Sequence, residues 1–134
     1  DEALKMMREE GLDNIFLRHN KHKLAMSNAV KALNLKLFAD EKYLSPSITA
    51  IKTEGIDAEE FRKKIKNNFD ILLAGGQDHL KGKIFRVGHL GYVNDRDIIT
   101  VISAISNTLL DLGKITSQQA GEALVVASKY LEGN

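Results

Sequence analysis

The sequence of 134 residues contains no cysteine and only one proline, Pro46. The absence of cysteine excludes a disulfide framework, a thiolate-ligated zinc or iron–sulfur site and a cysteine nucleophile within this chain. An excess of one charge is also missing, because 19 Lys and Arg residues stand against 18 Asp and Glu residues. The resulting net charge of +1 provides no general attraction to nucleic acid or to an anionic membrane.

Long apolar stretches are missing as well, since the longest run without a charged residue extends only from Ile98 to Leu110. A helix that crosses a bilayer needs about 20 apolar residues. We therefore expect no membrane and no nucleic-acid partner, and a cytoplasmic location. With 43% hydrophobic and 28% charged residues, the composition is that of an ordinary globular domain, which we expect to cover residues 1–134 as one unit.

Apolar spacing divides the chain into helices and strands. Apolar residues three and four apart predict helices over Asp1–Glu10, Leu12–Leu33, Asp57–Asn68, Asn94–Leu112 and Thr116–Leu131. Short apolar runs next to glycine, serine or proline predict strands over Leu35–Phe38, Ile48–Ile51, Asp70–Ala74 and Lys83–Val87. This order indicates an α+β fold. We expect a small, mostly antiparallel sheet of about four strands with helices packed on one face.

Capping residues support the predicted helix ends. Gly11 separates the first helix from the second, as expected of a glycine just beyond a helix terminus. Asp57 with Glu60, and Thr116 with Gln119, have the spacing of a capping box, in which two side chains satisfy the first free N–H groups of a helix.

Two histidine groups are candidates for metal binding or acid–base chemistry. His19 and His22 are three residues apart on a predicted helix, but the arginine and lysines beside them repel a cation. We expect a solvated basic face there rather than a metal site. Asp78 and His79 could form an acid–base couple, but no hydroxyl or second carboxylate has a spacing that completes a nucleophilic set. We favour a surface loop for this pair.

Two further patterns resemble binding sites without meeting their requirements. The glycines between Gly75 and Lys83 follow a strand, but a phosphate-binding loop would need glycine at Gln77 and a hydroxyl residue at Ile84. We expect a turn here and no nucleotide site. The four basic residues between Arg62 and Lys66 have no aromatic residues interleaved on their face, which favours a solvated charged surface over a nucleic-acid patch.

The most informative segment runs from Phe85 to Gly91 and reads Phe-Arg-Val-Gly-His-Leu-Gly. Arg86 lies between two apolar residues on a predicted strand, where an unpaired charge would be costly, so it requires an anion. A guanidinium group matches the two oxygens of a carboxylate, and Gly88 allows a ligand or another chain to approach the backbone. One interpretation is therefore a carboxylate-binding site. The other, which these residues alone favour, is an internal ion pair with an Asp or Glu of the core.

Several segments, spread over nearly the whole chain, match the sequence of a known protein family. They are Glu10–Leu12, Arg18–His19, Ser45–Ile51, Gly55–Asp57, Leu73–Gln77 and Leu80–Gly91. With them the chain resembles the small C-terminal domain of the class V aminotransferases, pyridoxal-phosphate enzymes of the alanine–glyoxylate and serine–pyruvate group. This group includes sequences labelled the small subunit of a soluble hydrogenase. A chain without cysteine offers no thiolate for a nickel–iron or iron–sulfur centre, so we disregard that label chemically.

The resemblance implies a residue for substrate binding. It implies the C-terminal domain of a fold-type I aminotransferase, in which Arg86 binds the α-carboxylate of an amino acid or 2-oxo acid. Gly75 and Gly76 are assigned only to shaping the loop near this arginine. The implied reaction is transamination, for which pyridoxal 5′-phosphate provides the electron sink. The cofactor's lysine, the aspartate facing its ring nitrogen and its phosphate-binding residues belong to the larger domain in that family, so no catalytic residue is carried over to this chain.

These implications extend to the domain organisation and the partners. Asp1 to Leu4 contain no initiator methionine and read as the interior of a helix, so we expect a C-terminal fragment without its large cofactor-binding domain. Such a fragment should hold no cofactor and catalyse no transamination. The full-length enzyme should contact its own large domain, a second copy in a homodimer, and an amino acid or 2-oxo acid. The alternative is a non-catalytic protein-interaction domain in which Arg86 pairs internally.

Overall fold

The computed structural model describes residues 1–132, which form five α-helices, two short 3-10 helices and four strands. The helices are α1 (Glu2–Glu10), α2 (Leu12–Ala32), α3 (Ala58–Phe69), α4 (Asp95–Asp111) and α5 (Ser117–Glu132), with the 3-10 helices η1 (Glu41–Tyr43) and η2 (Asp78–Leu80). The strands are β1 (Lys36–Leu37), β2 (Ile48–Lys52), β3 (Ala74–Gly75) and β4 (Ile84–Gly88). They form one antiparallel sheet in the order β1-β2-β4-β3.

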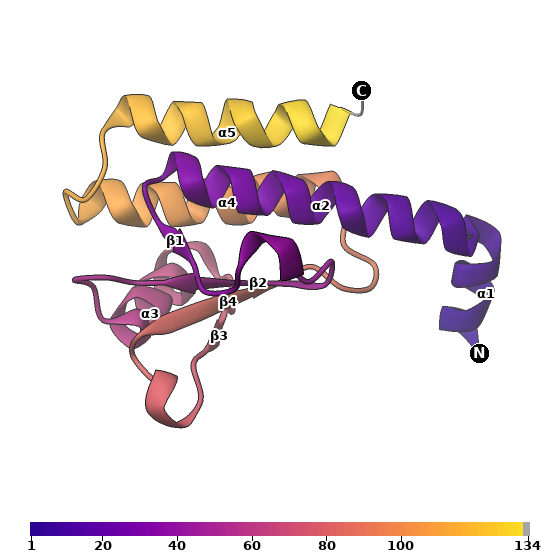
Figure 1. Cartoon of the computed structure of the whole chain (residues 1–134), viewed down its shortest axis with the longest axis horizontal. Coiled ribbons are helices and arrows are strands. Elements are labelled where there is room, and N and C mark those ends of the chain that lie inside the picture. Colours follow the sequence, from indigo (N-terminus) through magenta and orange to yellow (C-terminus); the bar gives the residue numbers. More distant parts are fainter. Residues whose placement is uncertain (133–134) are drawn as a thin grey trace.

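The long helices are stacked on one side of this sheet (Figure 1). α2 and α4 lie between the sheet and α5, which packs against both of them. α3 packs against α4 and against β3 and β4, while α1 projects at one end of the molecule (Figure 1). The predicted α+β class, with an antiparallel sheet and helices on one face, is therefore confirmed. Within residues 1–132, no helix is both long and apolar enough to cross a bilayer.

The two faces of the sheet differ because side chains alternate along each strand. In β4, Phe85 and Val87 are buried, and their cross-strand partners Ile51 and Thr49 in β2 are buried too. We call this helix-packed side the covered face. Arg86 points to the opposite side, which we call the open face, where it lies half-buried. The register of β2 and β4 thus separates an apolar side from a side that carries a cation.

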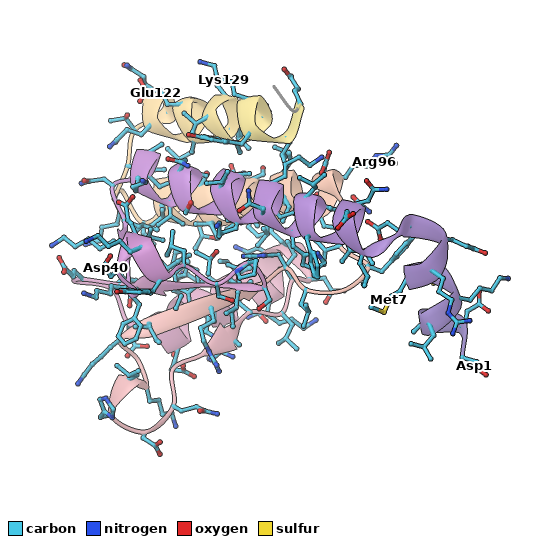
Figure 2. All side chains as sticks on the ribbon, turned by 45° about the vertical axis from the view of Figure 1, so that its right-hand side comes forward. Asp1, Met7, Asp40, Arg96, Glu122 and Lys129 are labelled. Atoms are coloured by element: carbon cyan, nitrogen blue, oxygen red, sulfur yellow. The ribbon has the colours of Figure 1, made fainter. Side chains whose placement is uncertain are left out.

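Side chains from all the layers fill the space between the helices and the sheet (Figure 2). The rings of Phe61 and Phe85 lie with their centroids 5.2 Å apart, so α3 is joined to the sheet by an aromatic contact. The other large side chains that are almost fully buried are mostly aliphatic: Met26, Leu33, Ile51, Ile65, Ile98, Ile102, Ile105 and Leu109. Their spacing of three and four residues in α4 is the pattern that predicts this helix.

Of the two predicted capping boxes, one is complete and the other is formed by its aspartate alone. Thr116 and Gln119 bond each other's backbone N–H groups at 3.2 Å and 2.9 Å, which completes the predicted capping box. The Asp57 carboxylate accepts the N–H groups of Glu59 and Glu60 at the start of α3. These bonds fix where α3 and α5 begin.

The prediction of a strand over Asp70–Ala74 is wrong, since only its last residue belongs to β3. Asp70 has a φ of 55°, in the left-handed region, and it ends α3 instead of starting a strand. Leu73 is buried, but its carbonyl accepts a hydrogen bond of 2.8 Å from Arg62 Nε. Leu73 and Ile71 therefore pack on the core without strand pairing, while Leu72 is exposed. The first predicted strand is likewise shortened, to β1 alone.

Candidate functional site

Arg86 is held on the open face by one backbone contact. Its Nε donates a hydrogen bond of 2.9 Å to the carbonyl oxygen of Gly75, on the neighbouring strand β3. Among residues 1–132, no carboxylate lies within 4.0 Å of its guanidinium group. The internal ion pair considered from the sequence is therefore not formed in the described part of the chain. The guanidinium is oriented by the protein but not neutralised by it.

Gly75 and Gly76 lie beside Arg86, and each is closely approached by other atoms. A Cβ on Gly75 would lie 2.5 Å from Arg62 Nη1, at the end of a flexible side chain. A Cβ on Gly76 would overlap the backbone carbonyl of Leu80, which cannot move without shifting η2. Position 76 therefore tolerates a side chain less well than position 75. Gly75 provides the carbonyl that orients Arg86.

The basic segment of α3 is mostly solvated, as predicted. Lys63, Lys64 and Lys66 are exposed. Arg62 differs, because it is half-buried, pairs with Glu59 at 2.8 Å and donates to the Leu73 carbonyl. It therefore fixes the chain segment that leads into β3.

The prediction that His19 and His22 lie on a solvated basic face is wrong. Both side chains are buried, with His22 fully inaccessible. His19 bonds the Ile15 carbonyl at 2.8 Å, and His22 Nε2 bonds a carboxylate oxygen of Asp95 at 2.9 Å. Their spacing from Ile15 to Met26 is four, three and four residues, which places them on the apolar stripe of the helix. This signal was present in the sequence, and the positive charges nearby obscured it.

Two of the cations beside these histidines, Arg18 and Lys21, are paired with carboxylates. Arg18 binds Glu10 with two hydrogen bonds of 2.6 Å and 2.9 Å, and the guanidinium lowers the pKa of that carboxyl. Lys21 bonds Asp95 at 2.9 Å. Although partial burial raises the pKa of Asp95, hydrogen bonds from Lys21 and His22 outweigh it and hold that pKa below its ordinary value. Burial lowers the pKa of His22 despite this contact.

The loop between β4 and α4 is tied to α2 by the same side chains. Arg18 Nη1 donates to the carbonyl oxygens of Gly91 and Val93, both at 2.9 Å, and the Gly91 N–H donates to His19 Nε2 at 3.3 Å. These bonds leave the side chains of Leu90 and Tyr92 pointing into solvent, with exposed fractions of 70% and 83%. The segment that follows Arg86 is therefore held in place while presenting apolar groups outward.

His89 and Thr49 form a buried polar pair that the sequence reasoning did not single out. Both are almost completely inaccessible, and Thr49 Oγ1 lies 2.9 Å from His89 Nε2. The other ring nitrogen, Nδ1, lies 3.0 Å from the Pro46 carbonyl. Burial lowers the pKa of His89 to about 4, with the neighbouring His22 and His19 contributing in the same direction.

An apolar region occupies the end of the molecule formed by α1, the start of α2 and the loop after β4. A cavity of about 300 Å³ opens here between α1, Ile15 and the loop residues Leu90 and Tyr92. Met7 is one of its lining residues and projects from α1 at the far end of the molecule (Figure 2). Further exposed apolar side chains on these elements are Leu4, Leu12, Phe16 and Leu17.

The last of the histidine candidates is the acid–base pair in η2. Asp78 and His79 are exposed in η2, which confirms the predicted surface position. Within residues 1–132, no group of three or more His, Asp or Glu side chains is arranged to hold a metal ion. The candidate site therefore consists of Arg86 and the glycines beside it.

No protein-family model matches the chain, but it is similar in sequence to several known proteins. It is 50% identical over 129 residues to a protein of Synechococcus sp. named soluble hydrogenase, small subunit, covering 96% of this chain and 33% of that protein. It is 35% identical over 136 residues to the serine–glyoxylate aminotransferase of Methylorubrum extorquens, covering 99% of this chain and 33% of that enzyme.

A solved structure agrees with these relatives. The ureidoglycine–glyoxylate aminotransferase of Bacillus subtilis superposes with a TM-score of 0.87 at 30% identity, over 96% of this chain and 34% of that chain. The chain thus spans about a third of the length of the curated relatives that it matches. Both the aminotransferase relatives and the hydrogenase-named relative agree with the resemblance seen in the sequence. The chain is a homologue of the small C-terminal part of the class V aminotransferases.

Proposed function

We propose that this chain is the substrate-binding small domain of a pyridoxal-phosphate-dependent aminotransferase, in which Arg86 binds the α-carboxylate of an amino acid or 2-oxo acid. The main support is the state of its guanidinium group, which Gly75 orients and which no carboxylate within residues 1–132 neutralises. A planar guanidinium offers two parallel N–H groups to the two oxygens of a carboxylate. The named substrates of the aminotransferase relatives belong to the same chemical class.

The chain's own contribution is to orient the substrate. The Gly75 carbonyl fixes the rotation of the Arg86 side chain before a ligand arrives, so less conformational entropy is lost on binding. Half-burial against the sheet also limits competition by water.

The residues of this chain do not fit the cofactor itself. A Schiff base to pyridoxal phosphate requires a lysine in an enclosed site, and every lysine of the chain is exposed or half-exposed. When bound, the cofactor supplies an electron sink for the substrate's α-carbon. In this proposal it is held by a larger domain that precedes this chain in a longer protein, and no chemical step is assigned to residues of this chain.

The proposal also assigns a role to the apolar end of the molecule. Apolar side chains gathered on α1, the start of α2 and the loop after β4 form a surface of the kind that contacts another protein surface. We assign that contact to the larger domain, within a cytoplasmic homodimer. The protein-interaction alternative would use the same surface for a separate partner, and it predicts no role for Arg86 in substrate use.

The test is a substitution of Arg86 in the full-length gene product purified with pyridoxal phosphate. Arg86→Lys keeps the charge but loses the paired N–H groups, so kcat/KM for alanine or serine should fall roughly 10- to 100-fold. The cofactor absorption band should remain. The matched control is Arg96→Lys on α4, an exposed arginine that points outward (Figure 2), and it should change kcat/KM less than about twofold.

Two outcomes would contradict the proposal. Equal losses of cofactor binding and of substrate use in Arg86→Lys would identify a structural arginine. A folded full-length protein without a Schiff-base band would favour the protein-interaction alternative.

A further inference from the structure

The buried histidine that follows β4 has a defined protonation pattern. His89 Nδ1 lies 3.0 Å from the Pro46 carbonyl, and because a carbonyl oxygen can only accept, Nδ1 carries the proton. In the neutral ring, Nε2 is then an acceptor, so the Thr49 hydroxyl donates to it across 2.9 Å. In the protonated ring Nε2 would instead donate to the Thr49 oxygen, so the contact exists in either form, and burial, which lowers the pKa of His89 to about 4, favours the neutral ring.

These bonds close one end of the β2–β4 strand pair. The backbone N–H of His89 also donates to the Ser47 carbonyl at 2.9 Å, so His89 is bonded to the segment before β2 and to β2 itself. Thr49 pairs with Val87 in the sheet register, and the next pair along the strands is Ala50 with Arg86. His89 is thus bonded to the strand pair at Thr49, one cross-strand pair away from Arg86.

The polar character of this pair is not explained by filling the core. The sheet face that Thr49 shares with Ile51, Phe85 and Val87 is otherwise apolar, and an apolar side chain could occupy the same volume there. A buried hydroxyl or imidazole nitrogen that lacks a hydrogen-bond partner is destabilising, so Thr49 and His89 each stabilise the other. Mutual dependence of this kind favours a single register of the two strands.

We propose that the Thr49–His89 hydrogen bond is a positioning device for Arg86, which fixes the ends of β2 and β4 so that the guanidinium stands where a substrate carboxylate meets it. This inference rests on the proposed function of Arg86. Thr49 and His89 are positioning residues, since they lie on the covered face and act through the strands that carry Arg86.

The test compares two substitutions of Thr49 in the full-length holoenzyme. Thr49→Val keeps the shape but removes the hydroxyl, and it should raise KM for the amino acid roughly five- to tenfold, as expected for one buried hydrogen bond, with kcat nearly unchanged. Thr49→Ser retains the hydroxyl and should restore KM to within about twofold. A purely structural role would lower the amount of folded, cofactor-loaded enzyme without moving KM.

The matched control lies at the other end of the same strand pair. Thr53 is a buried threonine whose hydroxyl bonds the Lys83 carbonyl at 3.2 Å, and Thr53→Val should leave KM unchanged. If Thr49→Val does not fold, His89→Asn provides a second route, because its amide can still donate to Pro46 but no longer reaches Thr49. It should raise KM to a similar extent.

Running Arg86→Lys in parallel separates the two proposals. A rise in KM for Arg86→Lys without a rise for Thr49→Val or His89→Asn overturns the positioning role and leaves the carboxylate site intact. An unchanged KM in Arg86→Lys overturns the proposed function, and the positioning role with it. An equal rise for Thr49→Val and Thr53→Val would show a general effect of buried hydroxyl loss, which also overturns the positioning role.

Discussion

Phe85 and Arg86 are adjacent in β4, yet their surroundings on the covered and open faces have little in common. Phe85 is fully buried against Phe61 and the core, and packing alone accounts for it. Arg86 has one backbone partner and a guanidinium group without a carboxylate nearby in residues 1–132. Packing thus dominates on the covered face, whereas the open face presents the cation to which the proposed function assigns substrate binding. Substitutions of the two neighbours should therefore affect different measurements.

The largest effect on stability is expected on the covered face. Phe85→Ala removes a buried ring and leaves a cavity, so the free energy of unfolding should fall by about 3–5 kcal/mol. Urea unfolding monitored by circular dichroism measures this change. Phe38→Ala, at a phenylalanine that is 43% exposed, is the control and should cost less than about 1 kcal/mol. Similar losses for the two variants would contradict the division between the faces.

An intermediate effect is expected from pH, because the covered face contains a neutral buried histidine. The pKa of His89 is about 4 in the folded protein and near its ordinary value of 6.5 when unfolded. Between pH 6.5 and pH 4 only the unfolded state binds a proton at this histidine, so the free energy of unfolding falls as the pH is lowered through this range. At pH 5 the loss is about 2 kcal/mol relative to neutral pH. Urea unfolding at pH 7.5 and pH 5 measures the change.

Other groups near His89 act in the same direction. The pKa of His22 is lowered as well, and it faces Asp95, whose pKa is also lowered and whose contribution is lost only at more acidic pH. His19 lies close enough to disfavour protonation of His89. His89→Gln should reduce the difference in stability between pH 7.5 and pH 5. An unchanged difference in that variant would assign the pH dependence to the other groups.

The smallest effect on stability is expected on the open face. Arg86→Met removes one hydrogen bond to Gly75 but no ion pair within residues 1–132. The free energy of unfolding should therefore fall by about 1 kcal/mol or less. The same urea titration applies, and amino acid turnover by the full-length enzyme should fall far more than stability does. A loss of stability as large as that of Phe85→Ala would show that Arg86 is a structural residue.

Local signals in the sequence predict most of the fold. The spacing of Ile98, Val101 and Ile105 predicts α4, and the Thr116–Gln119 pair predicts where α5 begins. The short strand β3 was not predictable in this way, because the Leu73 carbonyl bonds a side chain from α3 instead of a strand. Strand pairing of so short a segment depends on tertiary contacts that propensity does not contain.

The candidate site was predictable only in part. Arg86 stood out because a cation between apolar residues of a strand needs an anion. The Thr49–His89 bond joins residues 40 positions apart, so it requires knowledge of the β2–β4 register, which sequence alone does not specify. His19 and His22 were assigned to the wrong environment because their charged neighbours were weighed above the apolar stripe they occupy.

The first helix, α1, differs from the other helices in how little packing stabilises it. α1 has nine residues and no buried side chain, and Gly11, with a φ of 82°, separates it from α2. So short a helix is only marginally stable by itself, since its nucleation is not repaid by packing. In the proposed full-length enzyme, a larger domain that covers Leu4 and Met7 only in the helical form would shift the coil-to-helix equilibrium of α1 toward the helix. The helix content of residues 2–10 would then report whether that contact has formed.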